Sequence, residues 1–279
     1  MGSFWQTLGQ KMAERWLTLL VIPGALYLAA IGVATTLGQA HALDVGRLHR
    51  RITAAARNPA VANGTGQIVL LVAALAAAAL VGLAAQVSGR VVEHAVLAAD
   101  WYTWPRPLRA VARWRIRRRA AAWDKAEAAY QAEREKARAA LELGRRADRA
   151  ERDRAYAMML RISEGRPERP TWSGERMHAV TTQLGESGID LPREWPRLWL
   201  TFPDSVRKEI TAARGELTRA TTLGGWAVLY LLLTAWWWPA ALVAAVVGGT
   251  ARYRVRGTVD TYAQLVEAGT LLQGREGPA

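Results

Sequence analysis

The sequence predicts an all-α integral membrane protein with a helical, arginine-rich cytoplasmic domain, and charge patterning carries this prediction. Residues 16–43, 58–89 and 220–251 contain no Asp, Glu, Lys or Arg, although the chain has a formal net charge of +13. About 20 apolar residues in a helix cross the ~30 Å hydrocarbon core of a bilayer. The segments between these runs are rich in Arg and Glu, which predicts a substantial part of the chain in water.

Composition supports the membrane prediction and excludes some chemistry. The chain has 13 Trp but 2 Phe, and tryptophan favours the boundary between membrane and water, where an apolar ring and a polar N–H are both accommodated. The absence of cysteine excludes disulfides, thiolate catalysis and cysteine-ligated zinc.

The N-terminal part is expected to hold an interfacial helix and a first span. Residues 1–15 place apolar side chains at helical spacing, which is typical of a short amphipathic helix in the headgroup layer. The apolar run over residues 16–37 then predicts an uncleaved membrane anchor. A cleaved signal peptide is the alternative, because Ala40-His41-Ala42 resembles a cleavage site, but the run is longer than a typical signal core.

A second span is predicted within residues 16–89, after a loop over residues 38–66 that carries Arg47, Arg50, Arg51 and Arg57. Within this second span, small residues recur every fourth position, a spacing that allows close helix packing in lipid. These helix-packing candidates are Ala74, Ala78 and Gly82. Chance spacing in an alanine-rich segment is the alternative interpretation.

Residues 90–170 are expected to form a basic juxtamembrane segment and a long charged helix. The basic cluster is Arg106, Arg109, Arg113, Arg115, Arg117, Arg118 and Arg119. Cations beside a span attract anionic lipid headgroups and fix topology. Nucleic acid is a second possible ligand, with Trp114 available for stacking, and simple solvated charge is a third. Proximity to the span favours lipid and makes nucleic acid the weaker candidate.

The charged helix is predicted over residues 120–162, which lack proline. Trp123, Tyr130 and Ala137 stand seven residues apart, a weak indication of a coiled coil. Gly144 is expected either to bend this helix or to close a helical hairpin.

Residues 171–219 predict a small helical cytoplasmic unit with an aromatic cluster between prolines. Trp195, Trp199 and Phe202 are candidate anchors for a protein partner, because large aromatic side chains dominate many interfaces. The alternative is that they pack inside the unit or at the membrane surface.

Residues 220–251 are compatible with one long span or with a transmembrane hairpin. In a hairpin the turn falls at Trp236, Trp237, Trp238 and Pro239. Arginines precede the run and also follow it, and a hairpin places both groups on one side. The positive-inside rule therefore favours the hairpin. The prediction is four transmembrane helices in the cell (inner) membrane, with the N-terminus, the middle domain and a tail over residues 252–279 in the cytoplasm.

One further pattern extends over residues 188–256. Leu191-Pro192, then Trp195-Pro196-Arg197-Leu198-Trp199, and later Trp236 to Pro239 resemble uncharacterised bacterial multi-pass membrane proteins. The resemblance implies a membrane location and provides no activity or site residues.

The sequence offers no catalytic, cofactor-binding or metal-binding motif, so an enzyme is not expected. The spans also lack ionisable residues, which coupled transporters usually keep at membrane depth. We therefore expect a membrane-anchored structural or signalling scaffold that presents the helical module to a protein partner or forms a homo-oligomer. The alternative is a self-assembling channel or membrane-permeabilising effector gated by that module.

Overall fold

The structure is a computed structural model that describes residues 21–56, 64–145 and 149–275. All regular structure within these ranges is helical, with no strand, which confirms the predicted all-α class. The amphipathic helix expected over residues 1–15 and Arg57 lie outside the described residues.

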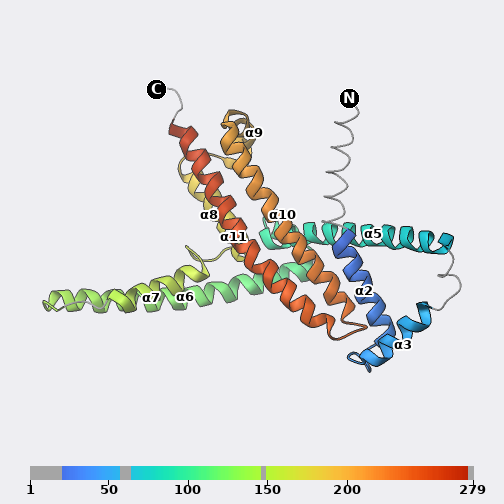
Figure 1. Ribbon diagram of the computed structural model, residues 1–279. Helices are drawn as coiled ribbons and strands as arrows, with labels where there is room; N and C mark the ends of the chain where they lie inside the picture. The colour runs from blue at the N-terminus through green and yellow to red at the C-terminus, as the bar shows by residue number, and fades with distance from the viewer. Residues whose placement is uncertain (1–20, 57–63, 146–148, 276–279) are drawn as a thin grey trace. The chain divides into compact units, whose positions relative to one another are not determined.

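The chain folds into two compact units. The apolar unit comprises Met1–Val92 and Thr218–Tyr253, and the charged unit comprises Glu93–Leu217 and Arg254–Ala279. The elements (Figure 1) are α2 (Ile22–Leu37), α3 (Val45–Ala56), α5 (Gly64–Leu97), the short 3-10 helix η2 (Trp101–Thr103), α6 (Arg106–Glu142), α7 (Arg149–Ile162), α8 (Trp172–Glu186), α9 (Leu191–Thr201), α10 (Asp204–Leu233) and α11 (Ala240–Arg275).

The apolar unit is built on a helical hairpin. Helix α10 ends at Leu233 and α11 begins at Ala240, with turns over residues 234–239. Pro239 has no N–H to donate and restricts the residue before it, which explains why one helix does not continue through this segment. The core between α2, α5 and the hairpin consists of Tyr27, Ala34, Ala85, Trp226, Leu233 and Ala240.

The charged unit contains a second helical hairpin. Helices α6 and α7 pack against each other, so the single long helix expected over residues 120–162 is two helices. Gly144 follows the end of α6 with φ +68°, the left-handed conformation that glycine adopts without steric cost. Trp123 and Tyr130 face α7. The indole N–H of Trp123 donates to the carbonyl of Ser163, the residue after the end of α7, and the ring of Tyr130 lies 5.2 Å from the ring of Tyr156.

The second half of α11 belongs to the core of the charged unit. A tail was expected after residue 251, but α11 continues to Arg275. The reason is a stripe of apolar residues at helical spacing, which is buried against the neighbouring helices. This stripe consists of Val255, Val259, Ala263 and Val266. The core beside it includes Val180 and Leu184 of α8 and Leu191 of α9.

The loop expected over residues 38–66 is also partly helical. Helix α3 occupies Val45–Ala56 and starts at Asp44, whose carboxylate accepts the backbone N–H of Arg47 at 2.8 Å. A side-chain acceptor at this position satisfies an otherwise unpaired N–H of the first turn. Arg47, Arg50 and Arg51 therefore lie on a helix.

Candidate functional site

Among the described residues, α5 is the helix that is long and apolar enough to cross a membrane by length and composition. Of its most apolar 18-residue window, 17% is buried. Helix α2 is apolar but shorter. The uncharged parts of α10 and α11, residues 220–233 and 240–251, are about 21 and 18 Å long at 1.5 Å per residue. Four membrane-crossing helices are therefore not confirmed.

The apolar unit exposes large apolar side chains on every helix of its bundle. On α5 every residue from 67 to 76 is exposed. Helices α2, α10 and α11 each expose leucine, valine or isoleucine side chains as well. Examples are Ile22 at 52%, Leu26 at 63%, Val69 at 63%, Leu80 at 67%, Leu231 at 61%, Leu242 at 62% and Val246 at 69%. A water-soluble surface rarely carries so continuous an apolar area.

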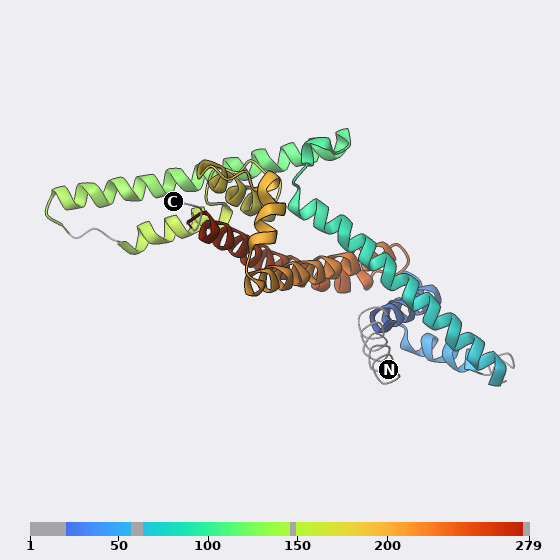
Figure 2. The same ribbon diagram turned by 90° about the horizontal axis from the view of Figure 1, so that it is seen from above.

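Small residues set the distance at which α5 crosses its neighbours in the apolar unit (Figures 1 and 2). A methyl group added at Gly225 of α10 would lie 2.6 Å from the nitrogen of Gly89, and one at Gly89 would lie 2.7 Å from the Cα of Thr222. A methyl group at Gly24 of α2 would overlap the carbonyl of Ala78. Close backbone approach of this kind is typical of helices packed in lipid.

The buried face of α5 is offset from the predicted one. Its buried residues are Ala78, Gly82, Ala85 and Gly89. Two of the predicted packing residues, Ala78 and Gly82, thus lie in this face, whereas Ala74 is exposed. The face begins one turn later because residues 67–76 of α5 are exposed.

Gln39 holds the turn between α10 and α11. Its side-chain amide donates to the carbonyls of Thr234 and Ala235 at 2.7 and 3.0 Å and accepts the backbone N–H of Trp238 at 3.1 Å. One side chain therefore binds three backbone groups of the turn, which would otherwise lack partners in an apolar setting.

The tryptophans of the turn fall into two groups. Trp237 donates its indole N–H to the carbonyl of Ala42 at 2.9 Å and so joins the turn to the chain before α3. Trp236 and Trp238 are 61% and 44% exposed, and Pro239 follows them. An exposed tryptophan pair beside an apolar surface is the arrangement found at membrane–water boundaries.

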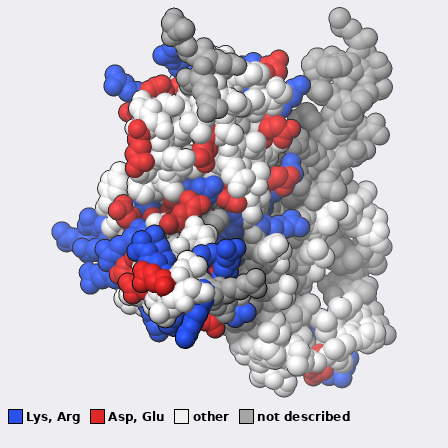
Figure 3. Space-filling view, turned by 90° about the vertical axis from the view of Figure 1, so that its left-hand side faces the viewer, with Lys and Arg blue, Asp and Glu red and all other residues white. Residues whose placement is uncertain are grey.

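The arginines of the predicted basic cluster do not share one environment. Arg106, Arg113, Arg115, Arg117 and Arg118 are exposed. Arg118 lies 5.5 Å above the ring of Trp114, which is itself 58% exposed. Figure 3 shows arginine and lysine side chains gathered with acidic ones over part of one face, while wide areas carry neither.

Two arginines of this cluster are engaged inside the charged unit. Arg109 donates to the carbonyl of Tyr102 at 3.3 Å. Arg119 is largely buried and donates to the carbonyls of Arg169 and Ile162 at 2.7 and 3.1 Å. The expectation that Arg119 faces lipid headgroups is therefore wrong, because its guanidinium is used within the fold.

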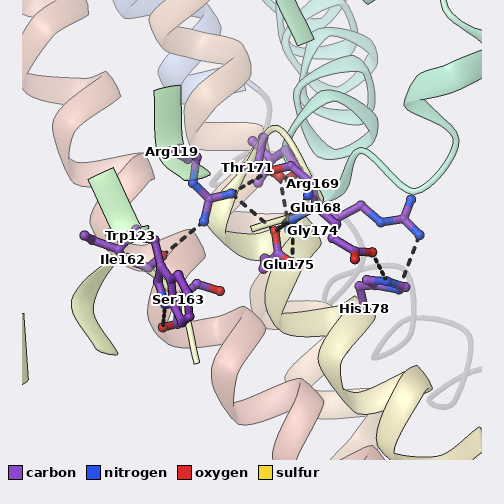
Figure 4. A network of polar contacts seen from close by, with 11 residues as sticks. Arg119, Trp123, Ile162, Ser163, Glu168, Arg169, Thr171, Gly174, Glu175 and His178 are labelled. Carbon is purple, nitrogen blue, oxygen red and sulfur yellow. Dashed lines mark hydrogen bonds and ion pairs between the residues drawn. The ribbon is translucent and has the colours of Figure 1, made fainter. Parts of the chain in front are cut away.

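Arg119 belongs to a polar bracket, defined as Arg119, Arg169, Thr171 and Glu175 (Figure 4). The buried Glu175 carboxylate accepts the backbone N–H groups of Glu168 and Arg169 at 3.0 and 2.8 Å and lies 3.6 Å from the Arg119 guanidinium. Burial lowers the pKa of Arg119, and the charge of Glu175 opposes this shift. The bracket fixes the loop between α7 and α8.

The same bracket caps the end of α5. The Thr171 hydroxyl donates to the carbonyl of Val96 at 2.5 Å and accepts the N–H of Gly174 at 3.1 Å, so it caps two helices at once. Arg169 donates to the carbonyl of Ala99 at 2.6 Å. Because the last carbonyls of a helix have no partner within it, these contacts tie α5 to α8 within the charged unit.

The predicted partner anchors lie mostly inside the charged unit. Phe202 is 2% exposed and packs beside Gly269 of α11. Trp195 packs on the core and lies 5.8 Å from Trp199 and 6.1 Å from Phe202 between ring centres. The structure therefore places Phe202 within the fold rather than on an exposed surface.

Sequence reasoning missed the bracket, although signals for it exist. Arg119 stands seven residues after Ala112 and four before Trp123, which are both buried on α6, so helical periodicity puts it on the packed face. Thr171 precedes α8 with Glu175 in the first helical turn, a pattern typical of a capped N-terminus.

No group of three His, Asp or Glu side chains that could hold a metal ion occurs in the ranges the structure describes. Comparison with protein-family models, with curated proteins and with solved structures finds no match to this chain.

Proposed function

We propose that this protein is a membrane-anchored scaffold that presents its charged helical unit to a protein partner, without catalytic activity. The observation that supports the proposal most directly is the apolar surface of the apolar unit. Leucine, valine and isoleucine side chains are exposed along α2, α5, α10 and α11, and the uncharged run of the α10–α11 hairpin is flanked by Arg219 and Arg252. Such a surface is stable in lipid and costly in water.

In the proposed topology the apolar unit crosses the inner membrane several times. The turn between α10 and α11 lies at one interface, where Trp236 and Trp238 are accommodated. Arg219 and Arg252 lie at the opposite interface, because their long side chains can reach the headgroups. A hairpin with legs near 20 Å is accommodated by local thinning of the bilayer. The charged unit and the basic cluster are then cytoplasmic.

The α6–α7 hairpin is the proposed presenting element. Apolar side chains remain exposed at its tip, with Leu141 at 65% and Leu143 at 70%. The earlier aromatic candidates are largely packed within the unit, so these tip residues are the better anchors. A protein partner, including a second copy of the chain, would bury them.

Single cysteines test the topology, because the natural chain has none. Leu141→Cys and Leu272→Cys place a cysteine at exposed positions of the charged unit. His41→Cys places one next to Ala42, whose carbonyl accepts the indole N–H of Trp237 in the α10–α11 turn. In intact cells, an impermeant maleimide is expected to label His41→Cys, whereas the other two variants react only after permeabilisation. Labelling of Leu272→Cys and Leu141→Cys on opposite sides would contradict the hairpin topology.

Photo-crosslinking in cells tests the presenting role. A photoreactive residue at Leu143 is expected to give a discrete crosslinked species, identified by mass spectrometry and lost when Leu141 is also changed to Ser. The matched control is Lys125 of α6, an exposed position away from the tip. Equal crosslinking from Lys125, or none from the tip, would count against this role.

A further inference from the structure

Helix α3 has one apolar and one basic face. Val45, Leu48 and Ile52 lie at positions i, i+3 and i+7, which one side of a helix shares. Val45 is 75% and Ile52 59% exposed, while Leu48 is half-buried, so most of this apolar face is not covered within the described part of the chain. Arg47, Arg50 and Arg51 project from the remaining arc of the helix.

The position of α3 within the apolar unit is fixed by hydrogen bonds. Gln39 binds the α10–α11 turn and Trp237 binds the carbonyl of Ala42, so α3 starts three residues after a residue held by the turn. Three residues span at most about 10 Å. The helix must therefore lie at the same end of the apolar unit as the exposed Trp236 and Trp238.

We infer that α3 is an interfacial helix that lies in the headgroup layer and binds anionic lipid headgroups through Arg47, Arg50 and Arg51. The inference rests on the proposed membrane location. A short helix with apolar residues on one face and arginines on the other is suited to the plane of an interface. Its charge complements anionic phosphates, and its apolar face continues the apolar surface of the unit to which it is tied.

This assignment gives Arg47, Arg50 and Arg51 a role that the positive-inside rule does not. Short loops on the outer side of a membrane are generally poor in arginine, so a plain loop with this composition fits the topology badly. On an interfacial helix, the same arginines contact headgroups at the surface and need not enter the hydrocarbon core.

Spin labels in the full-length protein test the inference in vesicles of phosphatidylcholine with phosphatidylglycerol. Labels at Ile52→Cys and Arg51→Cys sample the apolar and basic faces of α3. The ratio of collisions with oxygen to collisions with a water-soluble nickel chelate rises with depth in the bilayer. We expect this ratio to be several-fold higher at Ile52→Cys. An equally water-accessible label at both positions would overturn the inference.

A third label separates failure of this inference from failure of the proposed membrane location. Val69→Cys lies on the exposed part of α5 and is expected to be oxygen-accessible in lipid. If this label is in lipid and Ile52→Cys is in water, the inference fails alone. If both labels are in water, the membrane location fails as well. An Ile52→Cys label inaccessible to both reagents would show a protein contact, such as a second copy, and would overturn the inference.

The headgroup preference is tested by replacing Arg47, Arg50 and Arg51 together with Gln. In the natural background, the ratio at Ile52→Cys is expected to fall several-fold when phosphatidylglycerol is omitted. The Gln variant is expected to show the same low ratio in both vesicle types. Equal ratios in both vesicle types for the natural background would overturn the assignment of these arginines to anionic headgroups.

Discussion

Single glycines set the distance between helices in the apolar unit. At Gly225 the neighbouring backbone is so close that a methyl group would lie 2.6 Å from the Gly89 nitrogen. No rotamer change relieves such a contact, because the obstructing atoms are backbone. Overpacking a tight contact typically costs about 1–3 kcal/mol.

We therefore predict that Gly225→Ala lowers the free energy of unfolding by about 1–3 kcal/mol. Thermal unfolding in detergent micelles measures the effect. The matched control is Gly249→Ala on α11, where no atom lies within 4 Å of the added methyl group; it is expected to be neutral or stabilising, because Ala favours helix more than Gly does. Equal stability of the two variants would contradict the close crossing.

Glu175 is the buried acidic residue of the polar bracket. Glu175→Gln keeps the shape of the side chain but leaves the Arg119 guanidinium without its counter-charge. Breaking such a buried pair costs about 3 kcal/mol, so the variant is expected to lower the stability of the charged unit by this order. Chemical denaturation monitored by tryptophan fluorescence measures the loss.

Asp153→Asn provides the comparison for this prediction. Asp153 pairs with Arg152 at 2.9 Å, but its side chain is 66% exposed. An exposed pair contributes at most about 1 kcal/mol. A similar loss for Asp153→Asn and Glu175→Gln would show that burial of the bracket has no special effect.

A third residue-scale prediction concerns pH. The Arg166 guanidinium donates to both carboxylate oxygens of Asp124 at 2.9 and 3.1 Å, and this hydrogen bonding lowers the pKa of Asp124. Because the folded-state pKa is lowered, the pair stabilises the fold above the unfolded-state pKa of about 3.9. The stabilisation is lost as the pH falls through the folded-state value.

Arg166→Gln is expected to return the pKa of Asp124 toward its ordinary range. A carbon-13 NMR titration of the aspartate carboxyl groups measures this directly. Arg152→Gln is the control, since it leaves the Asp124 pair intact. An Asp124 titration that is unchanged in Arg166→Gln would contradict the contact.

At the scale of elements, the α6–α7 hairpin depends on its closing turn. Gly144 has φ +68°, and a left-handed conformation costs most other residues about 1–2 kcal/mol. Gly144→Ala is therefore expected to accelerate amide hydrogen exchange at the tip of the hairpin by about tenfold, as a cost near 1.4 kcal/mol implies. Gly165→Ala, at a glycine with an ordinary φ and open space around it, is expected to change little.

The sequence pattern did not predict helix α3. Its apolar stripe is short, and the arginines between the apolar residues suggested a polar loop. Asp44 and the clamp from Gln39 and Trp237 fix its start and position, and those partners come from segments almost 200 residues apart in sequence. Local composition cannot report such contacts.

At the scale of the whole molecule, the two units do not follow the order of the chain. Residues 90–170 and 171–219 were expected as separate parts, yet Glu93–Leu217 form one charged unit together with Arg254–Ala279. The cause is that α10 and α11 each change character along their length. Residues 220–233 of α10 and 240–251 of α11 are uncharged, whereas the rest of each helix carries charge around an apolar stripe.

The apolar unit predicts how the whole protein behaves on extraction. Its exposed leucine and valine side chains are expected to keep the full chain in the membrane fraction after an alkaline carbonate wash, which removes peripheral proteins. Detergent is then needed for release. Recovery of the chain in the carbonate supernatant would contradict insertion of the apolar unit into a bilayer.

The sequence by itself determined the all-helical class, because long uncharged runs predict membrane-spanning helices and the charged, proline-free run over residues 120–162 predicts a helix in water. It also identified Ala78 and Gly82, which lie in the buried face of α5. The tertiary structure decided which polar residues are used internally: Arg119 faces Glu175 instead of solvent, and Phe202 packs beside α11. The physical reason is that periodicity reports which residues share a face, whereas burial depends on partners that folding brings from distant parts of the chain.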